Sequence, residues 1–579
     1  MVDITRPWVV DSPLSKRFPV YTRGNVGEVA ADVATPLFWT MIGGQHSERV
    51  WRKALADFGA FDEDEYQTDD IVIQGLVHGY VYLNLSLMRV FGVRMPGASP
   101  ELMDRTYLGE GADVPPYVPH PDDAAPKYQE RILQSVQRVM STQSRPDIVE
   151  DAKKAEALRA ARPDFSKMSD AELVAYERSV MQEYHAPILY KHLLLVYESS
   201  LVTGLLEEAL APLGDPTLAV RLMAGLGNVA SAEPVAELWK MSRIVAGSPE
   251  LTAEFDAGVD GLLDRIRSRT DDASRTFLEA FDKFIYDFGS RSADEWEAQP
   301  QTWETHPEIP LGLIERMRLQ PDDRDPKLQS ERLRAEREQL TEELRKRLAG
   351  NPEQLGKLEH ALRLISVYLP VRELSKGNTI RVVHEARMAI RELGRRYVEA
   401  GHFSRIEDIT MVREDELDAL IADPASFRPI IAERWEWYHA LKEYEPPRIL
   451  NGEIPPITQW PKRKEPLVSP AKPGDILVGL AACPGVATGT ARIINDPSEA
   501  TELQPGEILV APMTDPGWTP LFTSAAAVVV NVGSALSHAA IVSRELGIPC
   551  VLGVEHATRR LTNGVRLTVD GTAGTVTVH

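Results

Sequence analysis

Apolar and polar residues follow two different periods along this chain, and the change comes near residue 450. From about residue 125 to 450, apolar residues recur every three or four positions, as in DAELVAYERSVMQEYHAPILYKHLLLVYESSLVTGLLEEAL (170–210). That spacing places them on one face of a helix. We therefore expect this part of the chain to be mostly helical. The stretch at 71–94 is apolar throughout and fits either a buried strand or a buried helix.

Two features of the helical part can be placed more closely. The stretch LEHALRLISVYLPVRELSKGNTIRVVHEARMAIRELGRRYVEAG predicts two long helices, interrupted near Pro370. The stretch GNPEQLGKL (350–358) is the nearest approach to a phosphate-binding loop, but it has one residue too many between its glycines and no Ser or Thr after the lysine. We interpret it as a connector between helices.

A proline-rich stretch divides the chain. Between residues 453 and 473 there are six prolines, at positions 455, 456, 461, 466, 470 and 473. Such a segment cannot continue a helix and forms a stiff, extended connector. After it come short apolar runs separated by glycines, with one clear helix at about 537–546. The pattern predicts a multidomain protein, with a mostly α domain at 1–452, a linker at 453–473 and a β/α domain at 474–579.

Composition narrows the class of protein. The net charge of the 579 residues is −22, from 64 basic and 86 acidic residues, which disfavours nucleic acids and anionic membranes as partners. We see neither a secretion signal nor an apolar run that could span a bilayer. The two cysteines suggest neither a disulfide framework nor, with the histidines, a metal site. We expect a cytoplasmic protein.

One histidine stands in a distinctive context, GSALSHAAIVSRELGIPCV (533–551). Gly533 and Ser537 favour a turn and a helix N-cap, and Gly547 fits the residue that ends the helix. His538 would then lie in the first turn, where free N–H groups and the helix dipole favour an anion. A histidine there could carry a phosphoryl group. A plain surface or capping histidine is the alternative.

This stretch resembles the phosphohistidine signature of the PEP-utilising enzymes. Two further stretches, ACPGVATGTARI (482–493) and MTDPGWTPLF (513–522), are similar to other recurrent parts of the swivelling domain in that family. The chain departs mildly from the pattern at Ser534, where many relatives have glycine, and at Cys483. The resemblance implies that residues 474–579 form a swivelling domain and that His538 becomes phosphohistidine, supported by Gly533 and Ser537.

The resemblance also bears on the phosphoryl donor. Family members take the group from PEP, bound on a barrel domain after the histidine domain, or from ATP, bound on an ATP-grasp domain. We recognise neither domain in these 579 residues. The resemblance therefore implies a separate ATP-grasp partner subunit, which would bind ATP and Mg²⁺.

The part before the linker is similar to the acceptor-binding region of rifampicin phosphotransferase and phenylphosphate synthase. Within it, RELSK places Arg372 and Lys376 one helical turn apart, with Glu373 beside them. Two cations can stabilise a transferring phosphoryl group, and a carboxylate can deprotonate a hydroxyl. An ordinary ion pair on a solvated helix face is the alternative.

Weaker candidates for acceptor binding follow from the same likeness. Arg291 and Glu295 in GSRSADEW are also spaced by four, and a structural ion pair is as good an interpretation as substrate contact. Asn25 and Glu28, with Thr35, fit turn and capping roles better than substrate contact. Four aromatic residues could line an acceptor pocket but fit a core better, namely Trp39, Tyr80, Tyr82 and Trp239.

These observations predict an ATP-dependent dikinase-type phosphotransferase. The group on His538 would pass to a small phenolic acceptor such as phenol or 4-cresol, as in the two-component aryl phosphate synthases that the chain resembles. Two alternatives remain. One is a component of an antibiotic phosphotransferase with a rifamycin-like acceptor, and the other is a non-catalytic phosphocarrier or regulatory protein.

Overall fold

A computed structural model describes most of the chain: residues 3–66, 71–108, 114–215, 217–227, 230, 233–298, 301–463, 468–495, 503–514, 516–533 and 537–579. The chain forms two compact units. The first contains Met1–Leu201, Trp296–Gln299 and Leu374–Leu467, and the second contains Val202–Glu295, Pro300–Glu373 and Val468–His579. The boundary at Leu467 falls within the proline-rich stretch, and the second unit also includes helices that precede it.

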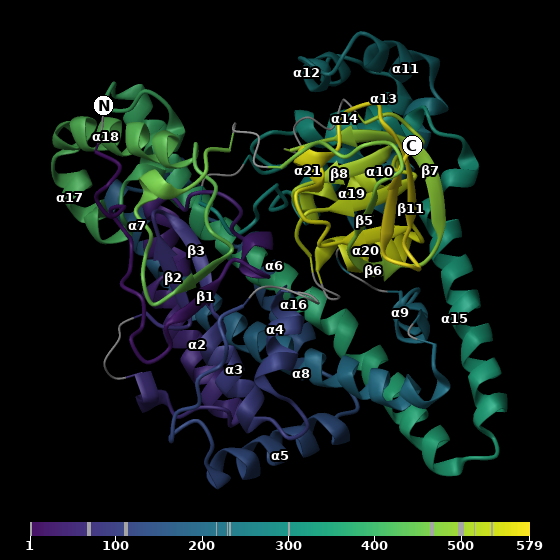
Figure 1. The fold of residues 1–579 in the computed structure, drawn as a ribbon. Coiled ribbons are helices and arrows are strands. Elements are labelled where there is room, and N and C mark those ends of the chain that lie inside the picture. The colour runs from purple at the N-terminus through teal and green to yellow at the C-terminus, as the bar shows by residue number, and fades with distance from the viewer. Residues whose placement is uncertain are drawn as a thin grey trace. The chain divides into compact units, whose positions relative to one another are not determined.

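The first unit is built from helices around a small antiparallel sheet of strand order β2-β3-β1-β4 (Figure 1). Its strands are β1 (Val20–Thr22), β2 (Gln74–Val77), β3 (Tyr80–Asn84) and β4 (Ile449–Asn451). Its main helices are α2 (Gln45–Phe58), α3 (Leu85–Arg94), α4 (Pro100–Leu108), α5 (Pro126–Ser141), α6 (Pro146–Ala160), α7 (Asp170–Ser179), α17 (Leu417–Ala422) and α18 (Pro424–Leu441). Helix α8 (Ala186–Leu210) begins in this unit and ends in the second.

The apolar stretch at 71–94 is both strand and helix. Strands β2 and β3 form a hairpin, with Val77 opposite Tyr80, and helix α3 follows directly. His78 and Gly79 make the two-residue turn with φ of 47° and 78°, the left-handed conformation that suits the twist of a hairpin. The side chain of Asn84 then caps α3 by accepting a hydrogen bond from the N–H of Leu87. Periodicity could not separate these elements, because both faces of the hairpin are buried.

Helix α16 (Pro352–Glu399) corrects one prediction: its 48 residues are continuous, with Pro370 inside the helix. An interior proline costs about 3 kcal/mol, since it removes a hydrogen bond and crowds the preceding turn. Buried apolar residues continue on both sides of it, including Leu364, Tyr368 and Ile380. Packing of that face outweighs the local cost. The connector predicted at 350–358 is shorter than expected: α15 ends at Leu348 and α16 begins at Pro352, so residues 352–358 are already helical.

The second unit contains helices and a larger sheet. Its helices before the proline-rich stretch are α9 (Thr217–Met223), α10 (Glu233–Ala246), α11 (Pro249–Asp256), α12 (Leu262–Arg267), α13 (Asp272–Phe288), α14 (Glu308–Arg318) and α15 (Pro326–Leu348). Helices α10 to α14 share one apolar cluster, in which Phe277, Phe281 and Phe284 stack along α13 and Trp303 stacks on Phe284. The predicted helical character of the chain before the linker is confirmed.

Residues 474–579, which we call the C-terminal domain, form an eight-stranded sheet of order β5-β12-β11-β7-β8-β9-β10-β6 (Figure 1, yellow). The strands are β5 (Ile476–Val478), β6 (Leu480–Cys483), β7 (Val486–Ile493), β8 (Ile508–Ala511), β9 (Ala527–Val530), β10 (Cys550–Leu552), β11 (Arg566–Asp570) and β12 (Thr575–Val578). Strands β7 to β10 are parallel, and the other pairs are antiparallel.

Alternating residues of the central strands bury both faces of this sheet. On β9, Val528 and Val530 join one apolar cluster, while Ala527 and Val529 join another. That alternation is the two-residue period of a strand covered on both sides. Helices α19 (Thr519–Phe522), α20 (His538–Leu546) and α21 (Ala557–Arg560) complete the domain. The predicted β/α fold after the linker is confirmed. Among the described helices of the whole chain, none is long and apolar enough to cross a membrane.

Candidate phosphohistidine site

His538 is the first residue of helix α20, which connects the parallel strands β9 and β10. Ser537 caps the helix, since its Oγ accepts a hydrogen bond from the N–H of Ala540 at 3.4 Å. Gly547 ends it with φ of 63°. The helix, its cap and its end were all predicted, and all three are confirmed. The first turn of α20, at the positive end of the helix dipole, therefore favours an anion next to His538.

Two buried hydroxyl groups hold the ring of His538. Its Nδ1 lies 3.1 Å from Thr514 Oγ1, and its Nε2 lies 2.9 Å from Thr519 Oγ1. The ring of Phe522 meets the imidazole edge-on, with 5.9 Å between centroids. A hydroxyl can donate to one nitrogen or accept from the other, so this pair accommodates either neutral tautomer and fixes the plane of the ring. A neutral ring nitrogen in a fixed position is what a nucleophilic histidine requires.

Topology brings these residues together. Thr514 follows β8, and His538 follows β9, its parallel neighbour. The carboxyl ends of parallel strands meet at one edge of a sheet, which is where open α/β sheets bind ligands. Sequence reasoning singled out the stretch MTDPGWTPLF but assigned no role to its two threonines. The two threonines are five residues apart, with a proline and a glycine between them, and this spacing was the one sequence feature that could have pointed to them.

Gly533 lies where the chain leaves the sheet for the histidine. A Cβ at this position would meet the side chain of Leu552 on β10 at 3.1 Å, which is tighter than ordinary packing. Glycine thus lets the turn approach the sheet closely. Ser534, a predicted departure from the family pattern, lies outside the described residues.

Arg291 and Glu295 form a buried ion pair, with 2.9 Å between Nη1 and Oε1. Their side chains are only 9% and 1% exposed. The pair is not helical, because α13 ends at Phe288 and the chain continues as a loop. That loop packs on the C-terminal domain: a Cβ on Gly517 would lie within 2.6–2.7 Å of backbone atoms of Ser292 and Ala293. The pair therefore stabilises a loop that touches the segment carrying Thr519.

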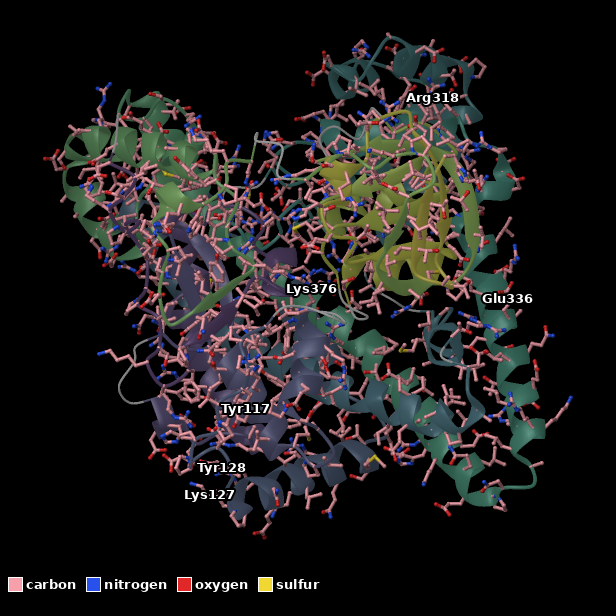
Figure 2. All side chains as sticks on the ribbon, viewed as in Figure 1. Tyr117, Lys127, Tyr128, Arg318, Glu336 and Lys376 are labelled. Atoms are coloured by element: carbon pink, nitrogen blue, oxygen red, sulfur yellow. The ribbon has the colours of Figure 1, made fainter. Side chains whose placement is uncertain are left out.

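The RELSK residues lie together near the middle of α16 (Figure 2 labels Lys376). Arg372 Nη1 is 3.8 Å from Glu373 Oε1, and the two side chains are 16% and 10% exposed. Lys376 is half-buried one turn further on. The boundary between the compact units falls between Glu373 and Leu374. A fully solvated helix face, the alternative considered above, does not describe side chains that are this buried.

Ser375 on the same turn of α16 also makes a contact that the sequence did not suggest. Its Oγ lies 2.9 Å from Nδ1 of His192, which is on α8 and 9% exposed. The ring of His192 lies 6.3 Å from that of Trp296.

Asn25, Glu28 and Thr35 lie in or beside short helical turns near the start of the chain, and contact with an acceptor stays a prediction for them. Asn25 comes directly before a short 3₁₀ turn (Val26–Glu28). Its own φ is 67°, and asparagine tolerates a positive φ better than most residues do. The side chain of Glu28 lies outside the described residues. Thr35 caps the short helix α1 (Pro36–Phe38) and donates a hydrogen bond to the buried carboxylate of Glu297 at 2.5 Å. Core positions are confirmed for the four aromatic residues, Trp39, Tyr80, Tyr82 and Trp239.

Comparisons with known proteins support the assignment of the C-terminal domain. Residues 503–574 match the family model described as "PEP-utilising enzyme, mobile domain". The C-terminal domain is therefore similar to this mobile domain over most of its length. Residues 192–373 match the model described as "Rifampicin phosphotransferase fourth domain". The predicted resemblance to the PEP-utilising enzymes and to rifampicin phosphotransferase is thereby confirmed.

Three relatives show how far the likeness extends. The chain is 28% identical over 598 residues to the prodigiosin synthesizing transferase PigC of Serratia marcescens, covering 99% of this chain and 64% of that protein. It is 26% identical to the rifampicin phosphotransferase of Streptomyces sviceus (73% of this chain, 48% of the relative). It is 30% identical to the rifampicin phosphotransferase of Bacillus cereus, over 52% of this chain and 34% of that relative. The chain thus spans less than two thirds of the length of each of these relatives.

Proposed function

We propose that this protein is a phosphotransferase in which His538 carries a phosphoryl group between two sites. The observation that carries the proposal is the arrangement around His538: an imidazole in the first turn of a helix, with its two nitrogens held by Thr514 and Thr519. The match of its domain to the mobile domain of PEP-utilising enzymes supports the same reaction.

The donor in this proposal is ATP, bound with Mg²⁺ on a separate ATP-grasp subunit. The unprotonated ring nitrogen of His538 attacks the β-phosphorus, the bond between that phosphorus and the oxygen of the AMP part breaks, and the other ring nitrogen releases its proton. Hydrolysis of the γ-phosphoryl group then leaves one phosphoryl group on the histidine. With water as co-reactant, ATP ends as AMP and inorganic phosphate, as the family resemblance implies. The N–H groups at the start of α20 stabilise the charge of the phosphohistidine.

The acceptor is proposed to be a small phenolic compound. Its oxygen attacks the phosphohistidine, the bond from phosphorus to nitrogen breaks, and the imidazole leaves. Glu373 would take the proton of the hydroxyl, and Arg372 and Lys376 would stabilise the transferring group. A phenol with a pKa near 10 needs only modest help from a base. Arg291, Glu295, Asn25 and Glu28 belong to this proposal as weaker candidates for acceptor binding.

A rifamycin-like acceptor is the second candidate, because residues 192–373 match a domain of rifampicin phosphotransferase. The phenolic and the rifamycin versions of the proposal divide the chain in the same way. Both have an acceptor domain at 1–452, a linker at 453–473 and a swivelling domain at 474–579. One histidine must visit a donor and an acceptor in turn, so its domain must move as a body.

The test uses [β-³²P]ATP, this chain, an ATP-grasp protein as partner, and the His538→Ala variant. We expect acid-labile, base-stable label on the wild-type chain alone. Phenol, 4-cresol and a rifamycin are then added separately to the labelled protein. Loss of label to one of them identifies the acceptor class. Label that persists against all three would contradict the phenolic and the rifamycin versions and favour a phosphocarrier.

A further inference from the structure

The two cysteines of the chain lie opposite each other on neighbouring strands. Cys483 is the last residue of β6, Cys550 is the first residue of β10, and the two are partners in the register of this antiparallel pair. Residues directly opposite in such a pair have Cα atoms about 4.5 or 5.5 Å apart and side chains on the same face of the sheet. A disulfide requires a Cα separation of about 4.4–6.8 Å. The backbone therefore brings the two sulfurs within reach of each other.

Both side chains belong to one buried apolar cluster that also includes helix α20. Cys483 is 3% exposed and Cys550 is fully buried, and the cluster contains Ala540 of the helix. The Sγ of Cys483 donates a hydrogen bond to the carbonyl oxygen of Ser543 on α20 at 3.3 Å. Both cysteines are free thiols in this structure. The two thiols thus share one side of the sheet, as their register requires.

Other uses of two buried thiols fit these surroundings less well. A structural zinc site needs four ligands, and among the described residues no group of three or more His, Cys, Asp or Glu side chains could hold a metal ion. Burial raises the pKa of each thiol to about 12, so neither is a ready nucleophile at neutral pH while the site is closed. A bond between the two sulfurs needs no further side chain and suits an apolar site.

Strand β6 is the place where an oxidant can enter. It is the last strand in the sheet order, and among the described strands it pairs with β10 alone. The ladder is irregular directly after Cys550, and Leu480 on β6 is 45% exposed. An edge strand is held from one side only, so it opens at a lower free energy than a central strand.

A small opening at the end of β6 is enough for a small oxidant. Water then reaches Cys483, and the pKa of its thiol returns toward the ordinary value of about 8.5, because burial is what raises it. Hydrogen peroxide is not much larger than water and enters through such an opening. Alkylating reagents such as iodoacetamide are larger and need the strand to open further.

We propose that Cys483 and Cys550 form a reversible disulfide when the protein meets hydrogen peroxide. The thiolate of Cys483 attacks one oxygen of the peroxide, the O–O bond breaks, and the hydroxide that leaves takes up the proton released by the thiol. Cys483 is then a sulfenic acid. When β6 closes again, the sulfur of Cys550 attacks the sulfenic sulfur, the S–O bond breaks, and the oxygen leaves as a second water with the proton of Cys550. The two thiols lose two electrons and two protons in all, and a dithiol reductant reverses the change.

The test treats the reduced, folded chain with hydrogen peroxide, removes the peroxide, and then unfolds the protein in N-ethylmaleimide. Peptide mapping shows whether each cysteine is alkylated or linked. We expect a linked pair of peptides that contain Cys483 and Cys550, and two alkylated cysteines again after dithiothreitol. Calorimetry should show the oxidised chain melting about 4–16 °C above the reduced chain, because the disulfide closes a loop that includes β7 to β9 and α20.

Two variants test the entry of the oxidant at β6. Cys550→Ser leaves Cys483 on the edge strand without its partner, so dimedone added on unfolding should trap a sulfenic acid there. Cys483→Ser is the matched control, because it leaves Cys550 on β10, which lies between β9 and β6. The control should give about a tenth of that adduct or less. Equal trapping in the two variants would overturn entry at the edge strand.

The wild-type chain alone decides whether the disulfide forms. Two alkylated cysteines after peroxide treatment of the folded protein would overturn the proposal. A linked pair that appears only when peroxide is added to the chain in urea would overturn it as well, because the folded register would then have no part in the reaction. None of these measurements involves His538, so the disulfide and the function proposed above stand or fall separately.

Discussion

The buried ion pair between Arg291 and Glu295 offers a test with a calculable size. In Arg291→Met, the carboxylate of Glu295 would remain in a site where it is 1% exposed, without the cation at 2.9 Å. Breaking a buried pair from one side costs roughly 3–5 kcal/mol, because the remaining charge cannot recover its hydration. For a cooperative unit of 150–250 residues, this corresponds to a fall of about 6–20 °C in melting temperature.

A nearby surface pair provides the control. Lys283 and Asp287 on α13 are also four residues apart, at 2.6 Å, but their side chains are 75% and 32% exposed. Lys283→Met should cost no more than about 1 kcal/mol, because water replaces the lost partner. The double variant Arg291→Met/Glu295→Gln should recover part of the stability lost in Arg291→Met, since no carboxylate charge then remains at this buried position.

Differential scanning calorimetry of the full chain measures these changes in melting temperature, with the unfolding transition of each compact unit analysed separately. The reasoning is refuted if Arg291→Met melts within about 2 °C of the wild type. If that variant also lost transfer to the acceptor, Arg291 would contact substrate rather than stabilise its loop. The experiment therefore decides between the two interpretations that the sequence left open.

Two further predictions concern the C-terminal domain. Ser537→Ala removes the cap of α20 and should lower the free energy of unfolding by about 0.5–2 kcal/mol in urea titrations; an unchanged midpoint would contradict the capping role. Burial raises the pKa of Cys483 and of Cys550 to about 12, so neither thiol should react with iodoacetamide at pH 8 until the protein unfolds.

The sequence predicted those parts of the site that depend on neighbours along the chain. The cap, the helix and the helix end around His538 are all local features, and each lies where its residue types predict. The contact of Thr514 and Thr519 with His538 could not be predicted from the sequence, because it depends on the pairing of β8 with β9. The register of a sheet is a tertiary property that a single stretch of residues does not contain.

One difference between prediction and structure has a clear physical origin. Pro370 was expected to interrupt a long helix, but buried residues on both sides of the proline maintain it. The local cost of about 3 kcal/mol is outweighed by that packing. For Arg291 and Glu295, the sequence suggested an ion pair that fixes a loop or a contact with substrate, and in the structure the ion pair lies in a loop.

The most direct test of the central claim needs no donor protein. Potassium phosphoramidate phosphorylates histidine side chains chemically, and ³¹P NMR follows the product. The wild-type chain is charged in this way alongside His538→Ala and His556→Ala, a control for a partly exposed histidine of the same domain. We predict a phosphohistidine signal in the wild type and in His556→Ala that disappears when phenol is added, as phenyl phosphate appears, and no such transfer in His538→Ala. Transfer of equal rate in His538→Ala, or a His538 that accepts no phosphoryl group, would contradict the account.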